Sequence, residues 1–382
     1  MVYDYIIGGT GAAGLQLALA MAKDPFFSEK QILLIDASAK LDNDKRWCFW
    51  EEGAGQWDAL ISAQWDHVVV RTPGNNYERP LGTYRYKMLM AGVFYADVLA
   101  QLAKHNHIHR VTDTIIKVEA SKQPVEIVGL AATYQAKHFF DSRVEEPLGK
   151  AARHQVRVFQ HFRGWEVETK APFFNRNKVE LMDFNYAKPG TCSFMYVLPY
   201  NEHKALVEFT VFSPHTWLAE EYEVYLRTYL KDQTYTIHAL EEGVIPMNTV
   251  PYHLAGGPFH TKIGTAGSWV KPSTGYSFKA AETKVALLIE QLKAGTTSPD
   301  GLINKRFRIY DRLLLDILAR HNAYGITLFD TLYRKNRLSL LFRFLDEKTR
   351  FTEELRIMAT FNPWPFMLSI ARGIWAYIKR NV

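Results

Sequence analysis

The first 38 residues contain two short apolar stretches separated by a helical one. Residues 2–8 (VYDYIIG) and 31–38 (QILLIDAS) predict buried strands, and residues 12–23 (AAGLQLALAMAK), mostly strong helix formers, predict a helix. A glycine turn joins the first strand to this helix. The order strand, glycine turn, helix and strand is typical of the opening of a doubly wound α/β fold.

The pattern changes after this opening. One helix and three strands are predicted before residue 150, at 88–104, 111–120, 125–130 and 136–143. From about residue 151 to 260, apolar and polar positions alternate, as in 191–198 (TCSFMYVL) and 204–212 (KALVEFTVF). We interpret this region as an inserted antiparallel sheet. Beyond it, a strand is predicted at 261–268, a long helix at 275–295 and only helices from 302 onward.

The turn after the first strand reads Gly9-Thr10-Gly11-Ala12-Ala13-Gly14, a G-x-G-x-x-G pattern, and Asp36 follows at the end of the next strand. The glycines let the backbone approach a pyrophosphate at a helix N-terminus, and Asp36 is placed to bind an adenosine ribose. An accidental glycine turn is the alternative. The pattern alone does not separate FAD from NAD, but its position at the start of a long chain favours FAD.

A second glycine-rich stretch occupies residues 264–278 (GTAGSWVKPSTGYSF) and includes Gly264, Thr265, Pro272 and Gly275. Pro272 and Gly275 can form a turn that directs the amides of the following helix toward an anionic group. A plain connection from strand to helix is the alternative. Two such turns suit a flavin dinucleotide, the first at the pyrophosphate and the second beside the isoalloxazine.

We therefore predict an α/β protein with an FAD-binding, Rossmann-like fold of the glutathione-reductase type. An antiparallel β-sheet for the substrate is inserted into it, and the C-terminus is helical. The predicted regions are 1–150 (first part of the FAD-binding domain), 151–260 (inserted sheet), 261–300 (return to the FAD-binding domain) and 301–382 (helical region).

Composition and charge add three constraints. Two cysteines, Cys48 and Cys192, are too few for a disulfide framework and fit a reducing cytoplasm. We identify no secretory signal, membrane span or metal-ligand spacing. Residues 301–382 carry fifteen Lys and Arg against seven Asp and Glu. This basic, aromatic tail is either a solvated helical face or a surface for anionic lipid headgroups or nucleic acid.

One acidic side chain shares a strand face with apolar neighbours. In residues 204–212, Glu208 alternates with Val207 and Phe209 and faces the same side as Leu206 and Phe212. It is either an edge carboxylate paired with a cation or an acid in a dry pocket. Burial would raise the pKa in the second case, so that the group stays protonated and can donate a proton.

Residues 43–52 (NDKRWCFWEE) concentrate aromatic and charged side chains. Trp47, Phe49 and Trp50 are either core residues or walls of an apolar cavity that tolerates cations. The segment follows Asp36 closely, where a bound FAD would extend from its adenosine toward the flavin. Arg46 is therefore a candidate partner for the pyrophosphate or the flavin.

With these motifs, the chain resembles the bacterial lycopene β-cyclases along nearly its whole length. The pattern N-x-R-x-W-C-F-W matches residues 43–50, and Gly264-Thr265 resembles this family where many other flavoproteins have Gly-Asp. Further matches are FDSR at 140–143, QHFRGW at 160–165, LMDF at 181–184, SFMYVLP at 193–199, ALVEFT at 205–210, GVIPM at 243–247 and FLDE at 344–347.

The resemblance implies a redox-neutral cyclisation of lycopene through γ-carotene to β-carotene. It implies reduced FAD as cofactor, NAD(P)H as electron donor and Glu208 in the essential acidic motif. It also places Asp183, Phe184 and Tyr276 at the substrate pocket, and it implies a cytoplasmic protein on the inner membrane surface that binds no nucleic acid. The alternatives are an FAD-dependent monooxygenase or prenyl-chain reductase, and a non-catalytic carotenoid-binding flavoprotein.

Overall fold

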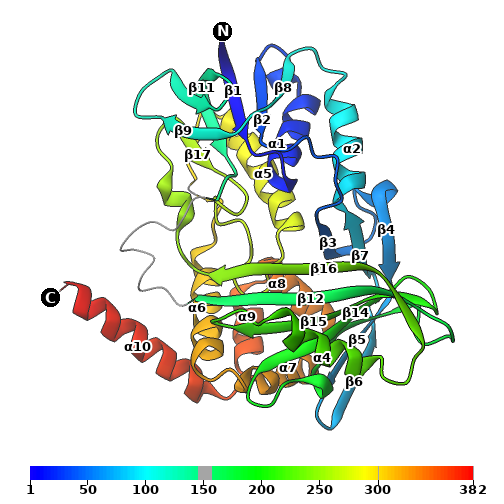
Figure 1. The fold of residues 1–382 in the computed structure, drawn as a ribbon. Helices are drawn as coiled ribbons and strands as arrows, with labels where there is room; N and C mark the ends of the chain where they lie inside the picture. The colour runs from blue at the N-terminus through cyan, green and yellow to red at the C-terminus, as the bar shows by residue number, and fades with distance from the viewer. Residues whose placement is uncertain (145–156, 300, 382) are drawn as a thin grey trace.

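The computed structural model describes residues 1–144, 157–299 and 301–381. Three sheets organise them, and Figure 1 shows the largely parallel sheet at one end of the molecule and the long-stranded antiparallel sheet at the other. The third, small sheet lies between these two at one side. Short 3-10 helices occur at Pro25–Phe27, Asp58–Leu60, Phe184–Tyr186 and Tyr252–Ala255.

The first sheet has seven strands in the order β8-β2-β1-β11-β10-β9, with β17 also paired to β11. The pairs β8–β2, β2–β1, β1–β11 and β11–β17 are parallel, as predicted for a doubly wound fold. Three helices share one apolar core with the sheet. The bounds are β1 Val2–Gly8, β2 Ile32–Asp36, β8 Ile108–Thr112, β9 Ile115–Glu119, β10 Val125–Gly129, β11 Thr133–Asp141, β17 His260–Lys262, α1 Ala12–Lys23, α2 Ala91–Leu102 and α5 Phe278–Lys293.

The second sheet has the order β16-β12-β15-β14-β13-β5-β6 and is antiparallel except at β13–β5. Strands β5 and β6 come from the first 150 residues, so the chain enters this sheet before the inserted region begins. Helix α4 (Ala219–Tyr229) packs on one face through Tyr222 and Leu226. The strand bounds are β5 His67–Thr72, β6 Asn75–Pro80, β12 Arg157–Thr169, β13 Lys178–Asp183, β14 Cys192–Pro199, β15 Lys204–Ser213 and β16 Tyr235–Asn248.

The small sheet contains β3 (Arg46–Glu52), β7 (Tyr84–Met90) and β4 (Ile61–Trp65) in the order β3-β7-β4. The aromatic stretch 43–52 is thus mainly the strand β3. The predicted start of a helix at residue 88 is wrong, because residues 88–90 extend β7 and pair with β3. Helix α2 begins at Ala91.

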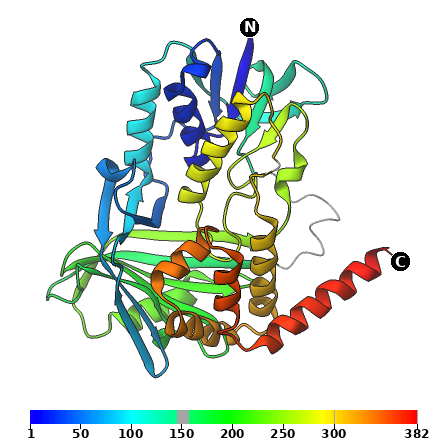
Figure 2. The same ribbon diagram turned by 180° about the vertical axis from the view of Figure 1, so that it is seen from behind.

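The C-terminal region is helical, as predicted. Helices α6 to α9 lie beside the second sheet, and α10 projects away from the body (Figures 1 and 2). No helix in the described part of the chain is long and apolar enough to cross a membrane. The bounds are α6 Lys305–Arg320, α7 Tyr324–Lys335, α8 Leu338–Leu345, α9 Phe351–Met358 and α10 Pro363–Asn381.

The strand predicted at 261–268 is shorter than expected. Strand β17 ends at Lys262, and the chain then turns with Gly264 at φ +59°. The amide of Gly267 donates to the carbonyl of Ile263, which closes a turn instead of a sheet ladder. The segment therefore carries the second glycine turn directly after three strand residues.

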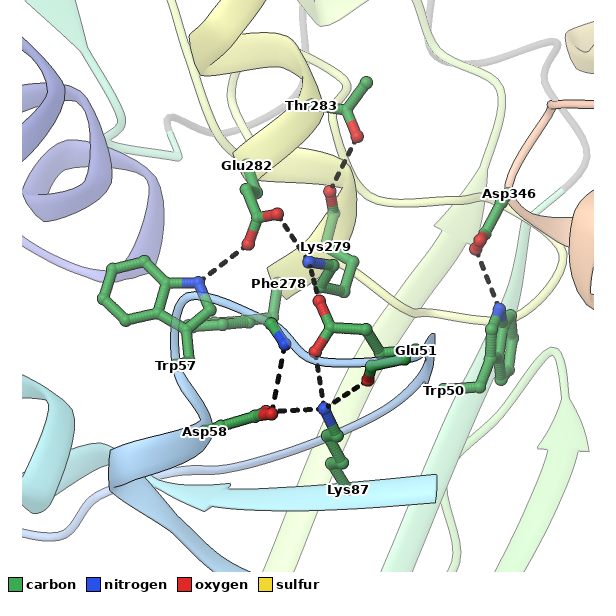
Figure 3. A network of polar contacts seen from close by, with 12 residues as sticks. Trp50, Glu51, Trp57, Asp58, Lys87, Phe278, Lys279, Glu282, Thr283 and Asp346 are labelled. Carbon is green, nitrogen blue, oxygen red and sulfur yellow. Dashed lines mark hydrogen bonds and ion pairs between the residues drawn. The ribbon is translucent and has the colours of Figure 1, made fainter. Parts of the chain in front are cut away.

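A buried polar network joins the small sheet to α5 (Figure 3). The amine of Lys87 is almost inaccessible and lies 2.9 Å from Glu51 Oε2 and 2.5 Å from Asp58 Oδ1. Lys279, on α5, contacts the other oxygen of Glu51 at 2.6 Å. Trp57 donates to Glu282, also on α5, at 2.7 Å. This network fixes β3 against the helix that follows the second glycine turn.

We expect Lys87→Met to lower the free energy of unfolding by about 2 kcal/mol, because Asp58 loses its cation and Glu51 keeps only Lys279. Urea unfolding followed by tryptophan fluorescence measures the change. Lys117→Met is the matched control, since Lys117 pairs with Glu119 on the surface and should leave the midpoint unchanged. Equal midpoints for the two variants would contradict a structural role for the network.

Candidate active site

One continuous cavity of about 1180 Å³ runs from the first glycine turn to helix α10. Its volume exceeds the roughly 300–1,000 Å³ that is typical of a pocket for one small ligand. Most of the site residues predicted from the sequence line it: Gly9, Gly11, Asp36, Arg46, Trp47, Trp50, Glu208, Gly264, Thr265, Gly275 and Tyr276.

The first glycine turn has the geometry that a phosphate-binding turn needs. Gly9 has φ +86°, and a Cβ on Gly14 would lie 2.1 Å from the carbonyl oxygen of Gly9. Gly14 itself does not line the cavity; it allows the helix to pack on the turn. A Cβ on Gly11 would meet nothing within 4 Å, and Gly11 does line the cavity. The N-terminus of α1 is therefore open to an anionic ligand at this point.

Asp36 lies at the end of β2 and faces the same part of the cavity. Its Oδ2 accepts hydrogen bonds from the amide of Thr10 at 2.5 Å and from the Thr10 hydroxyl at 3.1 Å. Lys40 lies 3.3 Å from Oδ1. The carboxylate is thus held beside the glycine turn, where an adenosine ribose would lie in a dinucleotide site.

The second glycine turn connects the first turn to the second sheet. A Cβ on Gly264 would approach Ala13 to 3.0 Å, so the two turns lie against each other. Gly275 has φ +73°. A Cβ on Gly275 would lie 3.1 Å from Oε1 of Gln160 and 3.1 Å from Cγ2 of Ile245, both in the second sheet. Pro272 does not line the cavity, and its predicted role in cofactor binding stays a prediction.

The aromatic side chains of β3 divide between cavity and core. Trp47 and Trp50 line the cavity, whereas Phe49 is buried in the core and stacks on Phe278 with ring centroids 5.4 Å apart. The prediction that Phe49 forms a cavity wall is therefore wrong. Trp50 is fixed by a 2.9 Å hydrogen bond from Nε1 to Asp346 and by stacking on Phe342.

Arg46 lines the cavity, but its partners belong to the second sheet. Its Nη1 donates to the hydroxyl of Tyr200 at 2.9 Å and lies 3.1 Å from Glu241 Oε2. Its Nη2 donates to Glu166 at 3.3 Å. These contacts direct the guanidinium to a group of carboxylates, and its predicted role in cofactor binding stays a prediction.

Glu208 lies in the middle of β15 and is 6% exposed. Its Oε1 accepts a 2.5 Å hydrogen bond from the hydroxyl of Thr210. Burial and the nearby Glu241 carboxylate raise the pKa of Glu208 to about 8, although Thr210 and Arg46 oppose the shift. The side chain is therefore protonated at neutral pH and faces the cavity, as the dry-pocket alternative requires.

Three tyrosine hydroxyls form a chain beside Glu208. Tyr86 lies 2.9 Å from both Tyr196 and Tyr276, measured between hydroxyl oxygens. Tyr196 is directly opposite Glu208 in the register of β14 and β15. Burial raises the pKa of all three phenols, so they are neutral groups in an apolar wall.

Asp183 and Phe184 do not line the cavity, so their prediction as pocket residues is wrong. Asp183 accepts the amide of Asn185 at 3.0 Å and lies 3.3 Å from Arg71. Phe184 is buried against Phe194 and other core residues. The motif at 181–184 reaches the cavity through its first two residues instead.

Several cavity residues escaped the sequence prediction. Glu241 lies two positions before the GVIPM motif, which was its one local signal. The C-terminal helices and the connection between α9 and α10 add apolar and aromatic residues to the wall that the sequence analysis did not single out: Phe329, Tyr333, Phe344, Phe361, Phe366, Met367 and Ile370. The described residues contain no group of three or more His, Cys, Asp or Glu side chains that could hold a metal ion.

Solved structures share this architecture at low sequence identity. A geranylgeranyl bacteriochlorophyll reductase-like protein from Thermoplasma acidophilum has 13% identity and a TM-score of 0.57 over 95% of this chain and 97% of that one. The flavin-dependent brominase Bmp2 has 14% identity and a TM-score of 0.56, with both chains fully covered. A flavoprotein/dehydrogenase from Cytophaga hutchinsonii has 11% identity and a TM-score of 0.59 over 91% and 93%. These similarities show the fold, that of FAD-binding flavoproteins.

Sequence comparison is more specific. No curated protein sequence matches the chain. A family model described as "Lycopene cyclase protein" matches residues 4–371, which is nearly the whole chain and includes both glycine turns, Glu208 and most of the cavity wall. The chain belongs to the lycopene cyclase family.

Proposed function

We propose that this protein is a lycopene β-cyclase, which closes the acyclic ends of lycopene into β-ionone rings by acid catalysis without net oxidation or reduction. The observation that carries this proposal is a buried, protonated Glu208 in a cavity that continues from a dinucleotide-type turn to apolar and aromatic walls. The proposed substrate is a hydrocarbon, so it requires a long, largely apolar cavity with a protonated acid in its wall.

The residues of the two glycine turns and Asp36 suit the binding of FAD. The open position at Gly11 and the N-terminus of α1 would hold the pyrophosphate, and Asp36 would bind the ribose. Thr265 and Gly275 would lie along the path toward the flavin ring. When bound and reduced by NAD(P)H, FAD would supply a fixed negative charge beside the reaction, which stabilises a cation in a site of low dielectric constant.

In the proposed mechanism, Glu208 donates its proton to the terminal double bond of the lycopene end group. The resulting tertiary cation is attacked by the neighbouring alkene, and loss of a ring proton leaves the cyclic product. The apolar walls exclude water, which would otherwise capture the cation as an alcohol. Rings such as those of Trp50 and Tyr276 can stabilise the cation by about 0.5–2 kcal/mol each.

An FAD-dependent monooxygenase or prenyl-chain reductase is the second candidate, favoured by the similarity of the fold to that of a reductase-like protein and a brominase. The mass of the product separates the candidates. A cyclase leaves the mass of lycopene unchanged, whereas a monooxygenase adds oxygen and a reductase adds hydrogen. A carotenoid-binding protein without activity would leave the absorption spectrum unchanged as well.

We expect Glu208→Gln to lower β-carotene formation in lycopene-producing cells by about 10²-fold or more, because the amide cannot donate the proton. Chromatography and mass spectrometry of the extracted carotenoids measure the product, and flavin absorbance of the purified variant checks the cofactor. Glu168→Gln on the neighbouring strand is the matched control, since Glu168 is exposed and pairs with Lys204 and His238. β-Carotene formation by a flavin-loaded Glu208→Gln protein would remove Glu208 from the mechanism.

The rate of cyclisation should depend on the proton of Glu208. Because its pKa is raised to about 8, the group is protonated below this pH and loses its proton above it. We therefore expect a constant rate from about pH 6 to 7, half of that rate near pH 8, and a fall of about tenfold per pH unit beyond. Initial rates with reduced enzyme on lycopene-containing liposomes test this profile. A rate that rises between pH 8 and 9 would contradict it.

Helix α10 is proposed to dock on the cytoplasmic face of the inner membrane, where lycopene is dissolved. Phe366, Met367 and Ile370 line the cavity from this helix, while Trp364 (65% exposed) and Leu368 (48%) present apolar surface to the outside. The helix ends a region with an excess of basic residues. An amphipathic helix that lines the cavity and ends a basic region suits the interface of an anionic bilayer.

The double variant Trp364→Ser/Leu368→Ser should lose most of its binding to anionic liposomes, because two apolar anchors are removed. Flotation in a density gradient measures the bound fraction. Ile116→Ser/Leu130→Ser is the control, since it removes two exposed apolar side chains at the sheet of the opposite end. Unchanged flotation of the α10 variant would contradict the proposed docking.

A further inference from the structure

A second carboxyl group, Glu241, faces the same cavity as Glu208. In the second sheet, Glu208 on β15 is paired with Gly164 on β12, and Gly164 is paired on its other side with Glu241 on β16. The three residues therefore form one row across three strands. Neighbouring strands are about 4.8 Å apart, so the Cα atoms of the two glutamates are about 10 Å apart with a glycine between them.

Gly164 has no side chain, so β12 places no group between the side chains of Glu208 and Glu241. A Cβ at this position would lie 3.1 Å from the Cβ of Glu208 and 3.2 Å from a methyl group of Leu206. Any side chain would thus project between the two glutamates. In the neighbouring row, the glycine is on β16 instead, and the ring of Phe162 covers Gly243. Phe162 and Gly164 are two residues apart on β12 and share one face, so this ring lies in the row next to that of the two glutamates.

The two carboxyl groups have different surroundings. The hydrogen-bond partner of Glu208 is the neutral hydroxyl of Thr210. Glu241 lies 3.1 Å from the cationic Arg46, which favours its charged form even though burial raises its pKa. Within the described residues, the buried Oε2 of Glu241 accepts no well-aligned hydrogen bond, and Nε of Arg46 has no acceptor. Glu241 is therefore the ion-paired member of the two, held by Arg46 at the wall of the cavity that Glu208 also lines.

We propose that Glu241 is the catalytic base that removes the ring proton, opposite Glu208 as the acid. The assignment rests on the proposed cyclase function. Glu208 loses its proton as a C–H bond forms at the terminal alkene, and ring closure moves the positive charge onto the ring. Glu241 then takes a proton from a ring C–H bond, whose electrons form the ring double bond. Glu241 then releases its proton and Glu208 takes one up before the next cycle, so one proton is donated and one removed per ring and no electron is consumed.

The position of a base decides which proton a ring cation loses. A cation at a ring carbon can lose a proton from any adjacent carbon, and each choice gives a different position of the double bond. A fixed carboxylate on one side of the ring selects one of these carbons through proximity. Glu241 would therefore determine the type of ring as well as the rate.

The test compares Glu241→Gln with the wild type and with Glu168→Gln in lycopene-producing cells. Glu168 is the matched control, since it does not line the cavity and pairs with Lys204 and His238. We expect Glu241→Gln to lower β-ring formation by about 10²-fold. Lycopene should still be protonated by Glu208, and the products should be ring isomers with a displaced double bond or alcohols formed by capture of water. Chromatography with mass and NMR spectroscopy identifies them.

Glu241→Asp separates proton transfer from support of the fold, because it keeps the carboxylate. It should give β rings at an intermediate rate, whereas equal losses in the Asp and Gln variants would overturn the assignment. β Rings at the wild-type rate in Glu241→Gln would overturn it as well. A wild-type chain that left lycopene unchanged would overturn the proposed function together with this assignment.

Discussion

The desolvation of one carboxyl group, that of Glu208, is the constraint on which the site depends. A carboxylic acid keeps its proton at neutral pH only where water cannot stabilise the anion, and burial supplies this condition in the middle of β15. The long strands of the second sheet place the group far from either edge. The helices beside this sheet and the aromatic strand β3 then cover the face that carries the acid.

Several other features serve the same condition. The tyrosine hydroxyls satisfy one another, so they add polar groups to the wall without adding charge. Arg46, the cation nearest to Glu208 among its charge partners, is largely neutralised by Glu166 and Glu241. The buried Lys87 is likewise paired away from the cavity wall, with Glu51 and Asp58. Charges are present near the site, but they are arranged so that Glu208 keeps its proton.

Local patterns predicted much of the fold and part of the site. The opening strand, turn and helix, Asp36 and the alternation around Glu208 follow from short sequence spans, because each depends on neighbours within a few residues. The pairing of Glu208 with Gly164 and Glu241 could not be predicted, since it depends on the register of strands that are distant in sequence. The alternation of residues along β3 likewise predicts which side chains share a face of the strand. It does not predict that Phe278 covers Phe49, because Phe278 is distant in sequence. The same limit explains the misplaced start of α2, because residues 88–90 follow the pairing of β7 rather than local helix propensity.

The position of α10 has a consequence for a substrate with two equivalent ends. Glu208 is at a fixed position in the wall of the cavity, and helix α10 lines the end of the cavity away from the glycine turns. In the proposed cyclase, a rod-shaped hydrocarbon with one end at Glu208 would extend its remaining length toward that helix. To present its second end, the molecule has to withdraw and reverse. The bilayer would thus be the medium in which a half-cyclised product turns around, and the ratio of one-ring to two-ring products would be a competition between re-entry and diffusion away.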